Sequence, residues 1–214
     1  GRGIYDNIKK FVTYLLAGNA GKLLVMFAAV LLGWPVPLLA VQILWLNLVT
    51  DGLAALALGM EKPERGVMRR KPRRPGEPLV GWADARRIVA HGAVSAAAAL
   101  VGFWVVWRGD DANLAEAQVV AFCVLGLAQL LYAFACRSRD ETAVGLGLLT
   151  NPALALAAGV SAALQLAVVL VPWLHPVFGV EAYPAAGEWG LILGLSVVPF
   201  AAAELAKLAR PRLP

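Results

Sequence analysis

Charged residues are scarce in this chain, and the stretches without them are long. Asp, Glu, Lys and Arg make up 15% of its 214 residues, whereas 60% are hydrophobic and the mean hydropathy is +0.70. This composition excludes an ordinary soluble domain, in which about a quarter of the residues are charged. The sequence therefore indicates a membrane protein.

Cysteine and histidine are also rare, with two residues of each kind. Cys123 and Cys136 form no CxxC pattern and have no neighbouring histidine, so we expect buried apolar residues rather than a disulfide or a metal site. The net charge of +5 comes without an interleaved aromatic and basic surface, which argues against nucleic acid as a partner. The two halves of the sequence lack the internal symmetry that is typical of many secondary transporters.

Six segments are long and apolar enough to cross a hydrocarbon core about 30 Å thick, which takes roughly 20 residues each. The predicted fold is an all-α membrane protein, a single transmembrane domain built as a six-helix bundle. Between the first two spans, the sequence GWPVP predicts a tight turn, so these spans should form an antiparallel hairpin. The predicted spans are residues 11–32, 38–58, 85–107, 115–136, 151–173 and 189–209 of a domain covering 1–214.

Lysine and arginine are concentrated in the segments on one side of the predicted bundle. Seventeen of the nineteen fall at the amino end, in loop 59–84 and the start of the third span, after the fourth span, or in the tail. Cytoplasmic loops retain positive charge, so both termini are predicted to be cytoplasmic. Loop 59–84 is expected to be a basic cytoplasmic loop that contacts anionic lipid of the bilayer. Short loops and a basic cytoplasmic side suit a multi-pass protein of a bacterial inner (plasma) membrane.

The second span, which contains WLNLVTDGLAALAL, carries polar residues in its middle. Asn47, Thr50 and Asp51 stand at i, i+3 and i+4, which places them on one face of a helix. An ionisable side chain at this depth costs about 2.5 to 3.5 kcal/mol, so it indicates a functional site. Carboxylate, amide and hydroxyl oxygens are the ligands of hard cations such as Ca²⁺, Mg²⁺ and Mn²⁺. Gly52 follows Asp51, and we expect it to loosen the helix and expose backbone carbonyls as further ligands.

The first span contains a second ionisable residue, Lys22, which stands at i+3 from Asn19 on the same predicted face. One interpretation is that these polar groups only join helices, with Asp51 neutralised by Lys22. Interhelical hydrogen bonds contribute about 0.6 to 2 kcal/mol, which does not offset the insertion cost of two ionisable residues. An ion pathway is therefore the favoured hypothesis.

Other polar residues in the spans carry less information. Gln129 in the fourth span predicts a hydrogen-bonding core residue, although it is also a candidate for the transport path. Glu204 and Lys207 should form an ion pair near the end of the sixth span. His91 and His175 have no neighbours in the sequence that suggest a ligand site.

The runs IYDNIKKFVTYLLAGNAGKLL, VQILWLNLVTDGLAALALGMEKPE and RRKPR closely resemble the carboxy-terminal membrane half of type II P-type ATPases, the calcium-pump group in particular. The resemblance covers essentially the whole chain, and NLVTDG is its most specific motif. It implies helices five to ten of a ten-helix pump that exports a divalent cation, Ca²⁺ or Mn²⁺. The pump would be an ATP-driven cation translocase.

The family's DKTG and TGDGVNDAP motifs do not occur in this sequence. We therefore expect a fragment or truncated copy that lacks the actuator, phosphorylation and nucleotide-binding domains and has no catalytic residue of its own. ATP and Mg²⁺ would act only through those missing domains. The implied partners are the rest of the pump, including helices one to four, and the lipid bilayer.

The resemblance also implies roles for individual residues. Asn47 and Asp51 match ion ligands on the family's helix six, with Asp51 the carboxylate shared by both calcium sites. Thr50 matches a ligand of the first site, and Asn19 matches a ligand on helix five.

Two positions depart from the pattern of two-site calcium pumps, because Lys22 and Gln129 stand where those pumps have glutamates. An ammonium cannot ligate a cation and repels it at close range. The expected consequence is one ion per cycle, at a site built from Asn47, Asp51 and a glutamate of the missing fourth helix. Lys22 would serve as a counter-charge that pairs with Asp51 when the ion has left. The alternatives are a stand-alone six-span channel or secondary transporter that uses Asp51 and Lys22, or a membrane scaffold without transport.

Overall fold

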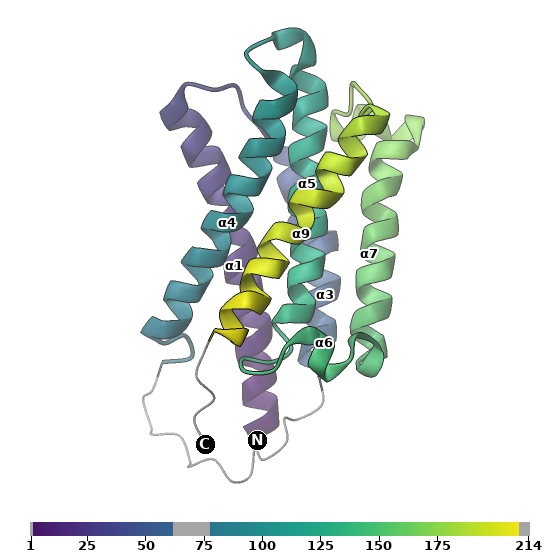
Figure 1. Ribbon diagram of the computed structural model, residues 1–214. Helices are drawn as coiled ribbons and strands as arrows, with labels where there is room; N and C mark the ends of the chain where they lie inside the picture. The colour runs from purple at the N-terminus through teal and green to yellow at the C-terminus, as the bar shows by residue number, and fades with distance from the viewer. Residues whose placement is uncertain (1, 62–77, 210–214) are drawn as a thin grey trace.

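The computed structural model describes residues 2–61 and 78–209, and every regular element in these ranges is a helix. Six helical segments are long and apolar enough to cross a membrane (Figure 1), which confirms the predicted all-α six-helix bundle. Residues 62–77 of the predicted basic loop 59–84 lie outside the described part of the chain. The spans are α1 (Arg2–Leu32), the run of α2 (Ala40–Trp45), η1 (Leu46–Thr50) and α3 (Asp51–Gly59), then α4 (Trp82–Trp107), α5 (Leu114–Ala135), α7 (Pro152–Leu170) and α9 (Ala186–Leu208).

Short helical turns connect several of these spans. They are η3 (Asp111–Asn113) before α5, α6 (Ala143–Leu146) and η4 (Leu148–Thr150) before α7, and η5 (Pro172–Leu174) and α8 (His175–Phe178) after it.

Local sequence signals set the ends of the long helices. Gly33 ends α1 with a φ of +67°, a conformation that favours glycine, and the chain reverses as GWPVP predicts. Asn151 caps α7, because its Oδ1 accepts a hydrogen bond from the Leu154 backbone N–H at 3.0 Å. The helix α1 begins at Arg2 rather than at residue 11, since hydropathy marks the apolar part of a span and not the helix that continues beyond it.

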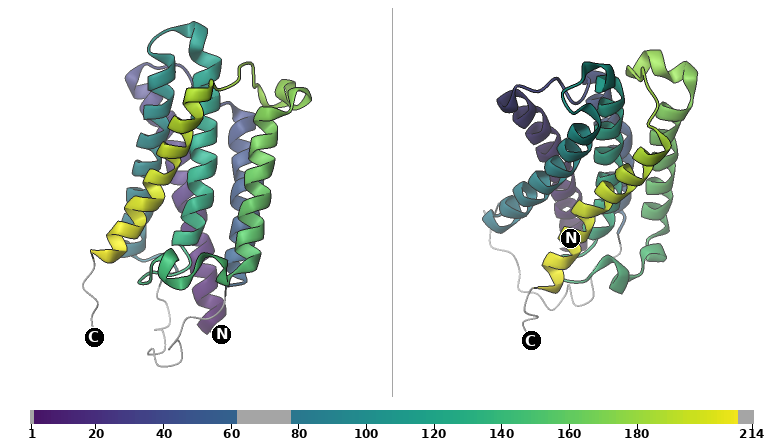
Figure 2. Two further views of the ribbon diagram at one scale, coloured as in Figure 1. Left: turned by 45° about the vertical axis from the view of Figure 1, so that its right-hand side comes forward. Right: turned by 45° about the horizontal axis from the view of Figure 1, so that its top comes forward.

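The helix α5 forms the centre of the bundle. Fifteen of its 22 residues are buried, whereas only four of the 23 residues of α9 are. It contacts α4, α9, α7 and α3, and Figure 2 shows it with α9 crossing one side and α7 standing on another. Both cysteines are free; Cys123 is buried in α5 as predicted, whereas Cys136, directly after α5, is only half-buried.

Small residues let α1 and α4 approach closely. A Cβ atom added to Gly92 of α4 would lie 2.9 Å from the Ala20 Cβ and 3.0 Å from the Gly21 backbone nitrogen of α1. Helices in lipid associate through such close packing, because no hydrophobic drive joins them there. The small residues of the third span thus allow close helix packing and hold α4 beside α1.

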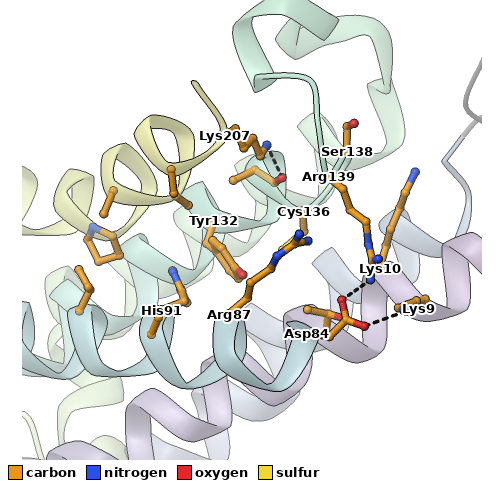
Figure 3. Close-up of a pocket in the computed structure, with 18 of the residues that line it drawn as sticks. Lys9, Lys10, Asp84, Arg87, His91, Tyr132, Cys136, Ser138, Arg139 and Lys207 are labelled. Carbon is orange, nitrogen blue, oxygen red and sulfur yellow. Dashed lines mark hydrogen bonds and ion pairs between the residues drawn. The ribbon is translucent and has the colours of Figure 1, made fainter. Parts of the chain in front are cut away.

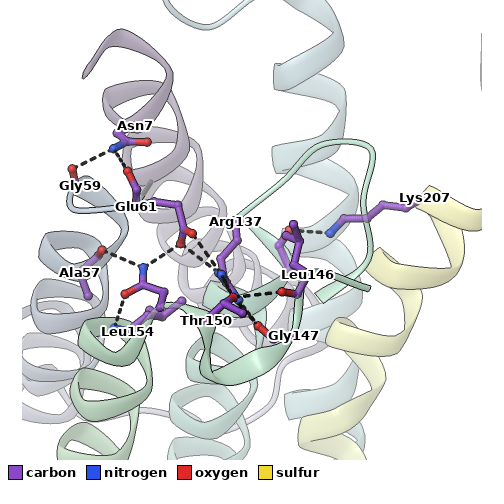
Figure 4. A network of polar contacts seen from close by, with 12 residues as sticks. Asn7, Ala57, Gly59, Glu61, Arg137, Leu146, Gly147, Thr150, Leu154 and Lys207 are labelled. Carbon is purple, nitrogen blue, oxygen red and sulfur yellow. Dashed lines mark hydrogen bonds and ion pairs between the residues drawn. The ribbon is translucent and has the colours of Figure 1, made fainter. Parts of the chain in front are cut away.

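The start of α1 and the end of α9 lie at the same end of the bundle (Figures 1 and 2). A polar network at this end joins four of the helical segments (Figure 4). Glu61, just after α3, accepts hydrogen bonds from Arg137 Nε at 2.9 Å and Nη2 at 3.1 Å, and from Asn151 Nδ2 at 2.7 Å. Asn7 Nδ2 of α1 donates to the Glu61 backbone carbonyl at 2.6 Å. This Glu61–Arg137 network fastens α1, α3, α5 and α7 to one another.

Candidate ion site

Lys22 of α1 reaches across the first hairpin to two side chains of the second span. Its Nζ donates hydrogen bonds to Asp51 Oδ2 at 2.6 Å and to Asn47 Oδ1 at 2.5 Å. The sequence placed these residues on two helices, and the structure brings them together. The ammonium occupies the point where these two side-chain oxygens converge.

The acid and the base of this pair are both removed from solvent. Asp51 is 1% exposed, Lys22 is 5% exposed and Thr50 is fully buried. Within the described residues, Asp51 Oδ1 and Thr50 Oγ1 have no hydrogen-bond partner. Buried polar atoms are nearly always hydrogen-bonded, so each of these two oxygens can still accept a hydrogen bond or bind a cation beside the Lys22–Asp51 pair.

The second span is irregular at this point, though not in the way the sequence suggested. The chain does not unwind at Gly52; instead, residues 46–50 form a π-helical turn in which the Asp51 backbone N–H donates to the Leu46 carbonyl. Such turns arise as single wide turns inside α-helices and are frequent at functional sites. The wide turn ends directly at Asp51 and so sets the direction of this side chain.

Side chains of other helices hold the π-helical turn from two directions. Ser161 Oγ of α7 donates to the Val49 carbonyl at 3.1 Å. The Tyr14 hydroxyl of α1 donates to the Thr50 carbonyl at 3.5 Å, and Tyr14 is fully buried. The turn is therefore supported by the fold and does not depend on its own sequence alone.

The sequence did not identify these supporting residues. Ser161 and Gln165 stand at i and i+4 in the apolar span α7, a spacing that could have signalled a polar contact. Gln165 Oε1 accepts a hydrogen bond from Trp45 Nε1 at 3.1 Å, and its Nε2 donates to the Phe122 carbonyl at 3.4 Å. Trp45 thus lies half-buried against α7, with its indole nitrogen paired, directly before the π-helical turn.

The two predicted asparagine ligands lie at the surface of this chain. Asn47 is exposed although its Oδ1 accepts from Lys22, and Asn19 is exposed on α1. Asn19 and Lys22 share a helical face only in part, because Lys22 turns into the bundle and Asn19 does not. The structure therefore joins Asn47 to the Lys22–Asp51 pair and leaves Asn19 outside it.

Gln129 of α5 lies beside the pair without bonding to it. Its Nε2 donates to the Tyr14 carbonyl at 3.1 Å, and a Cβ on Gly18 would overlap its amide. A cavity of about 10 Å³ separates the groups, lined by Gln129, Lys22, Asp51 and four neighbours. This volume is near the minimum that a single water needs. Gln129 therefore joins α5 to α1, as the hydrogen-bonding core residue that the sequence indicated.

The described residues supply one carboxylate to this site. In ranges 2–61 and 78–209, no three His, Cys, Asp or Glu side chains are grouped as metal ligands usually are. Glu204 and Lys207 form the expected ion pair at 2.7 Å, and this pair belongs to the end of α9, away from Asp51. The arrangement can offer a cation two or three oxygens, and it needs further ligands to complete a coordination shell.

Six membrane-length helices that enclose a lysine–aspartate pair define an integral, multi-pass membrane protein with an ionisable site between its helices. Residues 35–209 match the family described as "Cation transporting ATPase, C-terminus". The chain belongs to this family, as the carboxy-terminal transmembrane domain of a cation-transporting P-type ATPase.

Named relatives agree with this assignment. The chain is 46% identical over 204 residues to a calcium-transporting ATPase of Bacillus subtilis, which covers 93% of this chain and 22% of the relative. It is 35% identical to calcium-transporting ATPase 1 of Bacillus cereus, over 98% of this chain and 25% of that protein. It is 32% identical to the endoplasmic reticulum calcium ATPase srcA of Aspergillus fumigatus, over 100% of this chain and 25% of that protein. The chain thus spans about a quarter of the length of these relatives.

Proposed function

We propose that the pump to which this domain belongs exports Ca²⁺ from the cytoplasm and carries one ion per cycle. One observation carries the proposal: the side-chain oxygens of Asn47 and Asp51 converge on a single cationic group, the Lys22 ammonium. Carboxylate and amide oxygens are ligands that Ca²⁺ prefers, and the relatives are named for calcium transport. Mn²⁺ accepts similar ligands and is the second ion to test.

Lys22 and the ion compete for the same two oxygens in this mechanism. A divalent cation about 4 Å from an ammonium is repelled by about 8 kcal/mol at an effective dielectric constant of about 20. The Lys22 side chain therefore has to withdraw when the ion binds, and it returns to Asp51 when the ion leaves. This return neutralises the empty site and reduces the need for counter-transported protons.

The same repulsion limits the number of ions. A second cation beside Asp51 would meet the first ion, the Lys22 ammonium and the neutral amide of Gln129, with no further carboxylate from α1 or α5 to balance it. The charge at the site therefore favours one ion per cycle.

Further ligands have to come from Thr50 and from outside this chain. Thr50 Oγ1 and Asp51 Oδ1 are buried and have no partner in the part of the chain that the structure describes, so both can turn to an ion without breaking a hydrogen bond. The face of α1 and η1 that bears Asn19 and Asn47 is exposed, and helices one to four of the pump would cover it and supply a glutamate. Asn19 becomes part of the site only when those helices pack against this face.

The orientation follows from charge. Most of the described lysines and arginines belong to the end of the bundle where α1 begins and α9 ends, so this end and both termini face the cytoplasm of a bacterial inner membrane. ATP hydrolysis with Mg²⁺ takes place in domains outside this chain.

The experiment that tests this proposal is ATP-driven uptake of radiolabelled Ca²⁺ into inverted membrane vesicles that contain the complete pump. Asp51→Asn removes the charge and keeps the shape of the side chain. Interactions with a charged group contribute about 1.5 to 3 kcal/mol, so the apparent Ca²⁺ affinity should fall about ten- to hundredfold. Uptake of Mn²⁺ in the same vesicles tests the choice of ion.

Asp140→Asn is the matched control, because Asp140 is exposed after α5 and the change is chemically the same. It should leave the Ca²⁺ affinity unchanged. Unchanged uptake in Asp51→Asn would contradict the proposal and would favour a scaffold role for this domain, with the ion bound elsewhere in the pump. Uptake that persists without ATP would favour a channel or secondary transporter.

A further inference from the structure

A second cavity, of about 320 Å³, lies between α1, α4, α5 and α9 at the end of the bundle where α1 begins (Figure 3). It shares no lining residue with the small cavity beside Lys22. None of the transport chemistry described above uses it. Charged lining residues lie at one end of the cavity and apolar ones lie further in, and this arrangement indicates what the cavity binds.

On α4 and α9 the lining of the cavity changes from charged to apolar with depth. On α4 it runs from Asp84 and Arg87 to Ala90 and Val94, ten residues or about 15 Å further into the bundle. On α9 it runs inward from Lys207 to Pro199. The cavity therefore has a polar mouth at the ends of the spans and an apolar interior at greater depth, the same order in which a phospholipid arranges its headgroup and chains.

Small side chains on α9 leave the apolar space open. The lining residues of α9 recur at helical spacing on one face, so they form a shallow wall where larger residues would close the cavity. These residues are Pro199, Ala202, Ala203 and Ala206.

Positive charge predominates at the mouth. Five basic residues line the cavity against two acidic ones, Asp6 and Asp84, and an excess of two positive charges remains when Glu204, the partner of Lys207, is counted. Asp84 is shared between Lys9 at 2.7 Å and Arg139. The basic residues are Lys9, Lys10, Arg87, Arg139 and Lys207.

Two buried polar atoms on the lining residues lack partners among the described residues. They are His91 Nδ1 and Thr13 Oγ1, and His91 is 7% exposed. The other ring nitrogen of His91 lies 3.2 Å from Ser95 Oγ, and the ring stacks on Tyr132 (Figure 3). Buried polar atoms are rarely left unpaired, so a polar group of a bound molecule is the expected partner for them.

We propose that this cavity binds an anionic phospholipid from the leaflet at this end of the bundle. The phosphate lies at the mouth between Lys10 and Arg87, and the glycerol and first acyl carbons lie against the small residues of α9. A free phosphate matches the mouth and leaves the apolar interior unfilled, whereas a lipid matches both. The inference does not depend on which ion the pump carries.

Lipid binding can be tested by native mass spectrometry of the complete protein in mild detergent, titrated with phosphatidylglycerol or phosphatidylcholine. Wild type should retain phosphatidylglycerol and lose phosphatidylcholine. A basic residue near an anionic lipid surface contributes roughly a fivefold change in affinity, so Lys10→Gln and Arg87→Gln should each weaken retention about fivefold. Ala203→Leu should weaken retention of phosphatidylglycerol with no change of charge, because it fills the apolar interior.

Arg108→Asn is the matched control, since Arg108 is exposed at the opposite end of the bundle and asparagine tolerates its φ of 47°. It should retain lipid as wild type does. Glycerol 3-phosphate distinguishes the two sources of phosphate: competition at lipid-like concentration would show a soluble-anion site and overturn the proposal. Equal retention of the two lipids, or unchanged retention in both Arg87→Gln and Ala203→Leu, would also overturn it.

Discussion

Two of the ion pairs among the described residues lie largely out of solvent and join helices, and they differ in how completely they are bonded. In the Glu61–Arg137 network, both Glu61 side-chain oxygens accept hydrogen bonds and Asn151 adds a third donor. In the Lys22–Asp51 pair, one carboxylate oxygen accepts from Lys22 and the other has no partner among the described residues. The first pair lies at the end of the bundle and the second lies between its helices.

This difference separates a structural role from a role in transport. A fully bonded pair has no capacity left for a ligand, and breaking it leaves several buried groups unpaired. A pair with an unused oxygen can exchange its partner, because an incoming cation finds ligands that it does not have to strip of hydrogen bonds. The Glu61–Arg137 network should therefore govern stability, and the Lys22–Asp51 pair should govern ion binding.

The largest expected effect is on stability, at the bonded pair. Arg137 is 3% exposed and also donates to the Gly147 carbonyl and to Thr150 Oγ1. Arg137→Met leaves the Glu61 carboxylate without its cationic partner, so we expect unfolding in detergent to become easier by about 3 to 5 kcal/mol. Arg86→Met, an exposed site on α4, is the control and should change stability by less than about 0.5 kcal/mol. Equal changes of the unfolding free energy in Arg137→Met and Arg86→Met would contradict a structural role for Arg137.

Removing both members of the Lys22–Asp51 pair should leave stability nearly unchanged and abolish ion transport. The double change Lys22→Met with Asp51→Asn leaves no uncompensated charge, so its unfolding free energy should stay within about 1.5 kcal/mol of wild type. Ca²⁺ uptake by the complete pump should nevertheless be lost. A double variant that unfolds readily would mean that Lys22 and Asp51 serve to hold the helices together, and the contrast between the two pairs would fail.

The smallest expected effect concerns the π-helical turn. Ser161→Ala removes the hydrogen bond to the Val49 carbonyl, and interhelical bonds of this kind contribute about 0.6 kcal/mol. Stability should fall by that amount, and the Ca²⁺ affinity should fall about threefold or less. Ser138→Ala, at the end of the bundle, provides a comparison that should leave the affinity unchanged. A Ser161 variant with wild-type affinity would show that the turn does not position Asp51.

The spans and the Lys22–Asp51 pair could be predicted from the sequence because both rest on local signals. Hydropathy marks a span wherever apolar residues run unbroken, and two ionisable residues in adjacent spans of a hairpin have few other partners. The side on which Asn19 lies could not be predicted, because a difference of one helical position decides whether a residue turns inward. The resemblance suggested a ligand role for Asn19 that depends on helices outside this chain.

The rest of the site depends on contacts between distant parts of the chain. The π-helical turn has no marked signal of its own in LNLVT, and it is held by Ser161 and Tyr14 from two other helices. In the sequence, Arg137 contributed only to the predicted orientation in the membrane. Its partner Glu61 lies 76 residues earlier, and no residue near Arg137 indicates this contact. Such pairs become visible only when the helices are packed.

The most direct test of the one-ion mechanism is the number of Ca²⁺ ions transported per ATP hydrolysed by the complete pump in sealed vesicles, measured for wild type and for Lys22→Glu. We predict one ion per ATP for wild type, because the Lys22 ammonium adds a positive charge beside Asp51, the one carboxylate that the described residues supply to the site. Lys22→Glu should raise the ratio above one. A wild-type ratio of two would contradict the account, because two ions would then share a site in which Lys22 and Asp51 form a pair.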